Sequence, residues 1–276
     1  MCTSPSGASL GVRRVDSVSI VSAIVAAAGA GLAAFFSYWQ QRRLSVWEKH
    51  NYMERYSASL AWAAFDLQSR LYNILRGQVV DRLPGPGSGY LTEFLSRGTP
   101  AEAEYARRST VFVLAEYLAW AEVLRRDIQF LNLGGSRINR KIMGQISLIS
   151  ADISDTSQTS NELRLFRAHQ RAIGELMVHP DSGHGQRWCL GYAEFCQRLD
   201  HDEAFASWFT GLLADVDRLA ADAVPAVPRL QKIQNDLVAL VDLLDPNAVR
   251  FPQFRQAFND GTPPALQPPA LAPSQP

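Results

Sequence analysis

The chain has 276 residues, with 27 basic and 27 acidic side chains and a formal net charge of zero. This balance produces no bulk positive field of the kind that attracts nucleic acid, so we expect no nucleic-acid partner. Three cysteines, an odd number, argue against a disulfide framework and favour a reducing compartment. The length suits one large folded domain, and the chain shows no internal repeat.

Residues 17–41 form an apolar run without a single charged side chain, SVSIVSAIVAAAGAGLAAFFSYWQQ. About 20 helical residues cross the hydrocarbon core of a bilayer, so this run is long enough to span it. Tyr38 and Trp39 stand at its C-terminal edge, where amphipathic rings favour the headgroup layer. The run predicts a transmembrane helix that follows a short N-terminal segment, residues 1–16.

A cleaved signal peptide is the alternative interpretation of this run. Arg13 and Arg14 would form its charged region, and residues 28–30 would supply small residues for cleavage. We favour an uncleaved anchor because the apolar part of a signal peptide is only about 7–15 residues long. Small residues spaced by four also permit self-association through the membrane helix, namely Ala26, Ala30 and Ala34.

The basic residues that flank the run indicate its orientation. Arg42, Arg43 and Lys49 follow it, against Arg13 and Arg14 before it. Cytoplasmic flanks carry the excess of basic residues, so this slight excess favours a cytoplasmic C-terminal part. We therefore predict a single-pass protein of the plasma (inner) membrane, with its C-terminal domain in the cytoplasm.

Residues 42–258 carry apolar residues at intervals of three and four, which predicts an all-α fold built as an antiparallel helical bundle. The predicted helices cover about 42–80, 99–133, 137–153, 159–178, 188–199, 202–223 and 229–244. Capping boxes at residues 99–102 and 159–162 mark two of the helix starts. The proline-rich residues 259–276 predict a disordered tail, which we interpret as solubilising rather than as a proline ligand.

Two groups of basic residues are candidates for contact with the membrane surface. Arg42 and Arg43 follow the membrane helix directly, and Arg137, Arg140 and Lys141 follow the turn between the second and third predicted helices. If successive helices alternate in direction, this turn returns to the bilayer. Each basic residue near anionic lipid contributes about 1 kcal/mol. The alternative is a solvated basic turn.

Charged residues on three predicted helices form a candidate ligand-binding cluster, namely Asp66, Arg70, Glu116, Arg171 and Glu175. Packing of these helices would bring them together inside the bundle, where each carboxylate would need an arginine. One interpretation is a functional site, either a pocket for a small anion or a lipid headgroup or an acid/base pair. The other, which we favour at this point, is a structural ion-pair network that fixes the helix register.

Motifs for metal, phosphate-loop or serine-nucleophile chemistry are absent from the sequence. A di-metal bundle needs Glu-x-x-His pairs on two helices, and none occurs. His179, His184 and Cys189 are too widely spaced for an ordinary zinc site. Neither a nucleotide-binding glycine loop nor the Gly-x-Ser-x-Gly elbow is present. We therefore predict no metal, no cofactor and no catalytic residues.

Four stretches together resemble a family of uncharacterised helical proteins from actinobacteria and other bacteria, which often carry an N-terminal membrane helix. These stretches are LQSRLYNIL (67–75), YLAWAEVLRRDIQFLNLG (117–134), LFRAHQRAIGELM (165–177) and GYAEF (191–195). The resemblance implies one helical domain over most of residues 55–255. It implies no activity, cofactor or site residue.

The sequence leads to three hypotheses about function. The first is a membrane-anchored, non-enzymatic interaction or scaffolding module with an unknown protein partner. The second is a domain at the membrane surface that binds or senses a small molecule or lipid headgroup through the Arg/carboxylate cluster. The third is a membrane-associated enzyme, for which the sequence names no reaction.

Overall fold

The structure is a computed structural model that describes residues 31–40, 56–76, 89–131, 137–182 and 187–258. The chain divides into two units, Met1–Asn51 and Tyr52–Pro276. The predicted tail, residues 259–276, lies outside the described residues.

In the first unit, residues 31–40 are helical and all of them are exposed. The large apolar side chains among them include Leu32, Phe35 and Phe36, each at least 58% exposed. Within the described ranges, no helix combines the length and apolar character needed to cross a bilayer. Most of the predicted membrane run, and the adjoining Arg42 and Arg43, lie outside the described residues.

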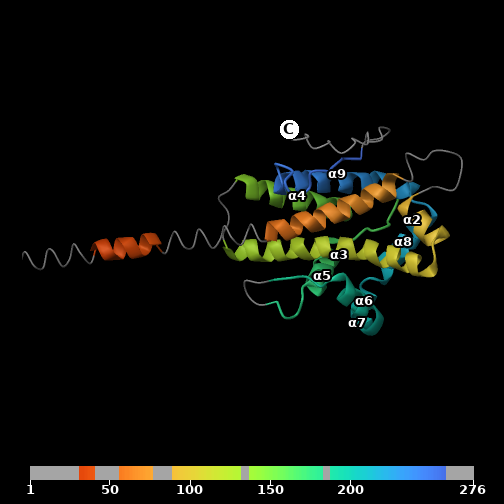
Figure 1. The fold of residues 1–276 in the computed structure, drawn as a ribbon, viewed down its shortest axis with the longest axis horizontal. Coiled ribbons are helices and arrows are strands. Elements are labelled where there is room, and N and C mark those ends of the chain that lie inside the picture. Colours follow the sequence, from red (N-terminus) through yellow and green to blue (C-terminus); the bar gives the residue numbers. More distant parts are fainter. Residues whose placement is uncertain (1–30, 41–55, 77–88, 132–136, 183–186, 259–276) are drawn as a thin grey trace, which may run out of the picture. The chain divides into compact units, whose positions relative to one another are not determined.

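The second unit is an all-α helical bundle (Figure 1). Its first described helix covers residues 56–76. The longer helices that follow are α3 (Pro100–Leu131), α4 (Arg137–Ile153), α5 (Arg167–Met177), α6 (Tyr192–His201), α8 (Thr210–Ala221) and α9 (Val227–Leu244). The shorter elements are α2 (Tyr90–Thr92), the π-turn η1 (Glu93–Arg97), α7 (Glu203–Ser207) and the 3₁₀ turn η2 (Val224–Ala226). The one β-bridge among the described residues joins Val178 to Cys189.

The helix at 56–76 packs antiparallel to α3. Tyr56, at its start, contacts Trp120, and Arg70, near its end, donates a hydrogen bond to Ser109 Oγ at 2.9 Å. The start of the first helix and the end of α3 therefore lie at the same end of the bundle. Helix α4 starts at that end too (Figure 1).

Helices α4 and α9 also pack antiparallel, with polar contacts at the middle of both helices and where α4 ends beside the first half of α9. Gln145 donates to the Asp236 backbone oxygen at 3.0 Å, and Lys232 pairs with Asp152. Most of the residues that these two helices bury are aliphatic, with Ile142, Ile149 and Leu237 among them. Burial of these residues removes apolar surface from water, which stabilises the fold by about 25 cal/mol for each Å² buried.

Helix α5 packs on α3 at unusually short range because Gly174 faces it. A Cβ atom on Gly174 would lie 2.7 Å from the Leu118 carbonyl oxygen and 2.9 Å from the Glu122 Cβ. Real Cβ atoms do not approach so closely, so only glycine allows this contact. The close approach places the side chains of α5 directly against those of α3.

The first predicted capping box is confirmed at the start of α3. The Glu102 N–H donates to Thr99 Oγ1 at 3.3 Å, and the Thr99 N–H donates to Glu102 Oε2 at 2.8 Å. The second box is wrong, because α5 begins at Arg167 rather than near residue 160. The predicted helix over 202–223 is also wrong as one element, since α7 ends at Ser207 and α8 begins at Thr210.

A buried arginine on α9 explains why the second capping box fails. The Arg229 side chain is enclosed and donates to backbone oxygens of Ser160, Glu162 and Asp155. The Leu163 N–H donates to a side-chain oxygen of Asp215 at 2.8 Å, and Leu163 has a left-handed φ of 55°. These bonds hold the segment before α5 in an irregular path and outweigh its local helical preference.

Candidate functional site

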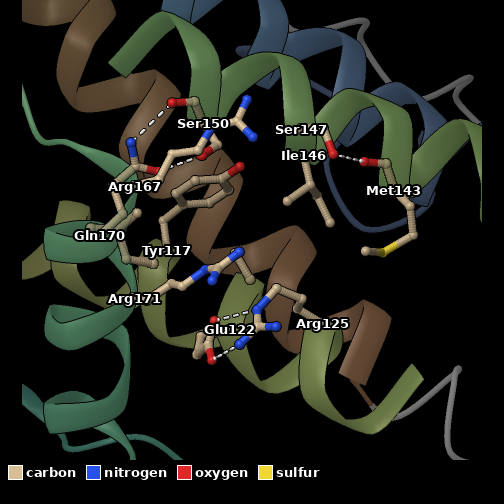
Figure 2. A pocket seen from close by; sticks show the side chains of 12 residues that line it. Tyr117, Glu122, Arg125, Met143, Ile146, Ser147, Ser150, Arg167, Gln170 and Arg171 are labelled. Carbon is tan, nitrogen blue, oxygen red and sulfur yellow. Dashed lines mark hydrogen bonds and ion pairs between the residues drawn. The ribbon is translucent and has the colours of Figure 1, made fainter. Parts of the chain in front are cut away.

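A pocket of about 150 Å³ opens where α3, α4 and α5 meet. Its apolar side is formed by Leu118, Ala121, Met143 and Ile146. Its polar side is supplied by Tyr117, Glu122 and Arg125 of α3, Ser147 and Ser150 of α4, and Arg167, Gln170 and Arg171 of α5. Figure 2 shows these side chains gathered from the three helices around one space.

Glu122 is the acidic group of the pocket, and two arginines neutralise it. Its side chain is 3% exposed and accepts hydrogen bonds from Arg125 Nε at 2.7 Å and Arg126 Nε at 2.6 Å. Burial opposes ionisation, but these hydrogen bonds outweigh it and hold the pKa of Glu122 below its ordinary value. Arg126 also pairs with Glu175. The positive charges of two arginines and the negative charges of two carboxylates therefore cancel within this network.

Arg167 and Arg171 supply uncompensated positive charge to the pocket. They stand four residues apart on α5, which places them on one face of the helix. Neither makes a hydrogen bond or ion pair with another described residue, and both line the pocket. An anion in the pocket would meet two guanidinium groups that no carboxylate already occupies.

Tyr117 lines the same pocket and carries an unsatisfied hydroxyl group. The residue is 1% exposed, and its buried hydroxyl has no hydrogen-bond partner among the described residues. Burial, and then the charge of Asp236, raise the pKa of Tyr117, so the group stays protonated. An unmade hydrogen bond of this kind costs about 1–3 kcal/mol. A ligand or water in the pocket would remove this cost.

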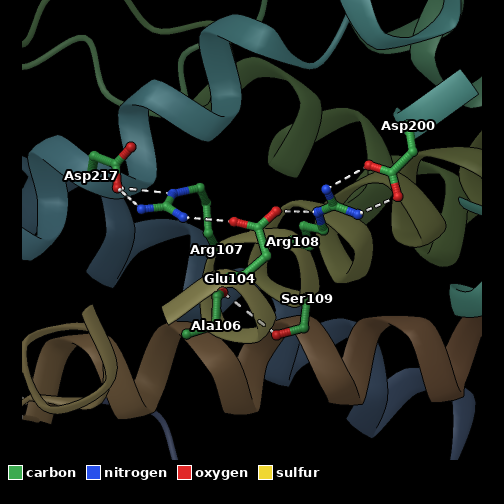
Figure 3. A network of polar contacts seen from close by, with 7 residues as sticks. All are labelled: Glu104, Ala106, Arg107, Arg108, Ser109, Asp200 and Asp217. Carbon is green, nitrogen blue, oxygen red and sulfur yellow. Dashed lines mark hydrogen bonds and ion pairs between the residues drawn. The ribbon is translucent and has the colours of Figure 1, made fainter. Parts of the chain in front are cut away.

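A second charged network on α3 differs from the pocket because all its cations are paired (Figure 3). Glu104 bridges Arg107 and Arg108, which also pair with Asp217 on α8 and Asp200 on α6. Two arginines thus face three carboxylates. The network ties three helices together and leaves no free cation to receive an anion.

Three of the five predicted cluster residues lie away from the pocket. Arg70 donates to Ser109 and Thr110 and stacks on Tyr90, with its guanidinium carbon 4.3 Å from the ring centroid. Glu116 is half-buried on α3 and makes no hydrogen bond or ion pair with a described residue. Asp66 is exposed, yet close enough that its charge acts on Glu116.

Only part of the predicted cluster lies at this pocket. Arg171 lines the pocket and Glu175 lies beside it through Arg126, whereas Asp66, Arg70 and Glu116 do not line it. The reason is helical geometry: Glu116 and Tyr117 are neighbours in sequence, and successive helical residues point about 100° apart. Glu116 turns toward the first helix, while Tyr117 turns toward α4 and α5.

The basic residues predicted at the membrane surface are exposed where the structure describes them. Arg137, Arg140 and Lys141 occupy the start of α4 and project into solvent. The start of α4 lies at the end of the bundle where the helix at 56–76 also begins (Figure 1). The contact of these basic residues with lipid stays a prediction.

Sequence reasoning missed Tyr117 and gave no role to Arg167. Tyr117 sits in an apolar stretch of α3 and resembles any core aromatic residue. Arg167 carried a usable signal, because it precedes Arg171 by four residues without an acidic residue between them. Among the described residues, no group of three or more His, Cys, Asp or Glu side chains is placed to hold a metal ion.

No protein-family model, curated protein or solved structure matches the chain.

Proposed function

We propose that this protein is a membrane-anchored helical domain that binds a small anion in the pocket between α3, α4 and α5. One observation carries the proposal: two arginines that pair with no described residue line one pocket together with Tyr117, whose buried hydroxyl has no partner among the described residues. Concave sites with a mainly apolar wall and a few convergent polar groups are the usual form of small-molecule sites. This observation supports the second hypothesis from the sequence, a domain at the membrane surface that binds a small molecule or lipid headgroup. A scaffolding role with a protein partner stays a prediction.

Binding is tested on the full-length protein in detergent by isothermal titration calorimetry with phosphate, sulfate, acetate and benzoate. We expect at least one anion to bind, and Arg171→Gln to weaken it about tenfold, the effect of losing roughly 1.4 kcal/mol. The control is Arg250→Gln, which removes an exposed arginine outside the pocket. Absence of heat with every anion, or equal weakening by both variants, would refute the proposal.

The membrane anchor is the second part of the proposal. It is supported by the uncharged run 17–41 and by the exposed apolar side chains Leu32, Phe35 and Phe36. Apolar side chains that project from a helix without protein cover are typical of contact with lipid. The proposed location is the inner membrane, with the bundle in the cytoplasm.

The anchor predicts that the protein sediments with membranes and resists a carbonate wash. A C-terminal tag should also be protected from protease in intact cells and be cleaved only after lysis. Release of a shortened soluble protein would instead indicate a cleaved signal peptide. Digestion of the tag in intact cells would show that the C-terminal domain lies outside the cytoplasm.

A further inference from the structure

We infer that the anion is a phosphomonoester, a group that carries close to two negative charges at neutral pH. This inference rests on the proposed function, because it names the ligand class of the same pocket. Glu122 and Glu175 are already neutralised by Arg125 and Arg126, so the charge that remains among the residues lining the pocket is that of Arg167 and Arg171.

Two unpaired guanidinium groups match a dianion better than a monoanion. A carboxylate or a phosphodiester carries one negative charge and would leave one of the arginines uncompensated. A phosphomonoester carries about −1.5 to −2 at pH 7 and offers three terminal oxygens as acceptors. Arginine binds such oxygens with two parallel N–H donors, so two arginines and the Tyr117 hydroxyl together satisfy the three oxygens.

The size and the apolar wall of the pocket limit what is attached to the phosphate. A volume of about 150 Å³ equals that of a cavity that accepts one benzene molecule. It holds a phosphoryl group and a short carbon stub, but not a nucleotide. Ala121, Met143 and Ile146 form the apolar wall against which the stub would pack. A free small phosphomonoester and the headgroup of phosphatidic acid both meet this description.

The decisive comparison uses methyl phosphate and dimethyl phosphate, which share the phosphate core and differ by one charge. Both are titrated into the full-length protein in detergent at pH 7.5, which keeps Asp236, the acidic group whose charge reaches Tyr117, in one state. We expect methyl phosphate to bind at least about tenfold more tightly than dimethyl phosphate or acetate. Arg167→Gln should reduce this preference to within about threefold, because one charge then remains.

Tyr117→Phe is a second variant, chosen because we expect it to fold as stably as the wild type. It removes a hydroxyl that has no partner among the residues that the structure describes, so the melting temperature of the free protein should not fall. Its affinity for methyl phosphate should nevertheless drop several-fold, because the ligand loses a donor.

The outcomes separate the inference from the proposed function. Equal or tighter binding of acetate or dimethyl phosphate would overturn the inference and leave anion binding intact. No binding of any of the three would overturn both. Nanodiscs distinguish the two sources: phosphatidic acid in the bilayer should compete with methyl phosphate if the headgroup is the ligand, whereas phosphatidylglycerol should not. Competition by neither lipid would assign the pocket to a free phosphomonoester.

Discussion

Replacement of Arg229 by alanine should lower the free energy of unfolding by about 4 kcal/mol, the largest effect we expect from one substitution. The side chain is 1% exposed and donates to three backbone oxygens in the segment before α5. Removing it leaves those oxygens without donors and opens a cavity at the same time. Urea denaturation followed by circular dichroism measures the loss.

Two further variants make this test specific. Arg250→Ala removes an exposed arginine and should change stability by less than about 0.5 kcal/mol. Arg229→Lys keeps the charge but has fewer donors, so it should recover only part of the stability. A loss below about 1 kcal/mol for Arg229→Ala would mean that the segment before α5 does not depend on this arginine.

Glu116→Gln should stabilise the protein by about 2 kcal/mol at pH 8 and by almost nothing at pH 4.5. Burial, and then the charge of Asp66, raise the pKa of Glu116 from 4.5 to about 7. The folded state thus favours the protonated carboxyl, and this stabilisation is complete below pH 4.5. It is lost as the pH rises through 7, since the folded protein must then hold a half-buried carboxylate without a partner. Glutamine stays neutral at every pH.

The measurement is the difference in unfolding free energy between the two proteins across this pH range. Asp236 has a pKa of about 6, raised mainly by burial and then by Asp152, and it contributes a slope of the same sign to both proteins. The difference between the proteins therefore isolates Glu116. Glu203→Gln, at an exposed position on α7, is the control substitution. A difference for Glu116→Gln that does not change with pH would disprove the raised pKa.

Much of the helical architecture could be predicted from local pattern. The start of α3 was predicted from Thr99 and Glu102, because a capping box needs only residues within one turn of each other. The range of α4 was also predicted correctly, since its apolar face repeats at helical spacing. These features depend on contacts between near neighbours in the chain.

The errors occur where a distant residue competes with local preference. Residues 159–162 have the composition of a capping box, but Arg229 binds the backbone oxygens nearby from almost seventy residues away. The sequence of that segment contains no sign of this partner. The predicted helix over 202–223 failed similarly, because Phe205 and Phe209 both pack with Phe195 on α6 around the break.

The candidate site shows the same division. The charges of Arg171 and Glu175 and their helical positions follow from the sequence, and so does the need of buried carboxylates for arginines. Which arginine meets which carboxylate depends on the angle at which helices pack, and Gly174 sets the approach of α5 to α3. Glu175 accordingly pairs with Arg126, and the unpaired Arg171 faces Tyr117 across the pocket. Whether a segment forms a helix depends on residues close together in the chain. A pocket depends on how three helices pack, and the sequence does not specify that packing locally.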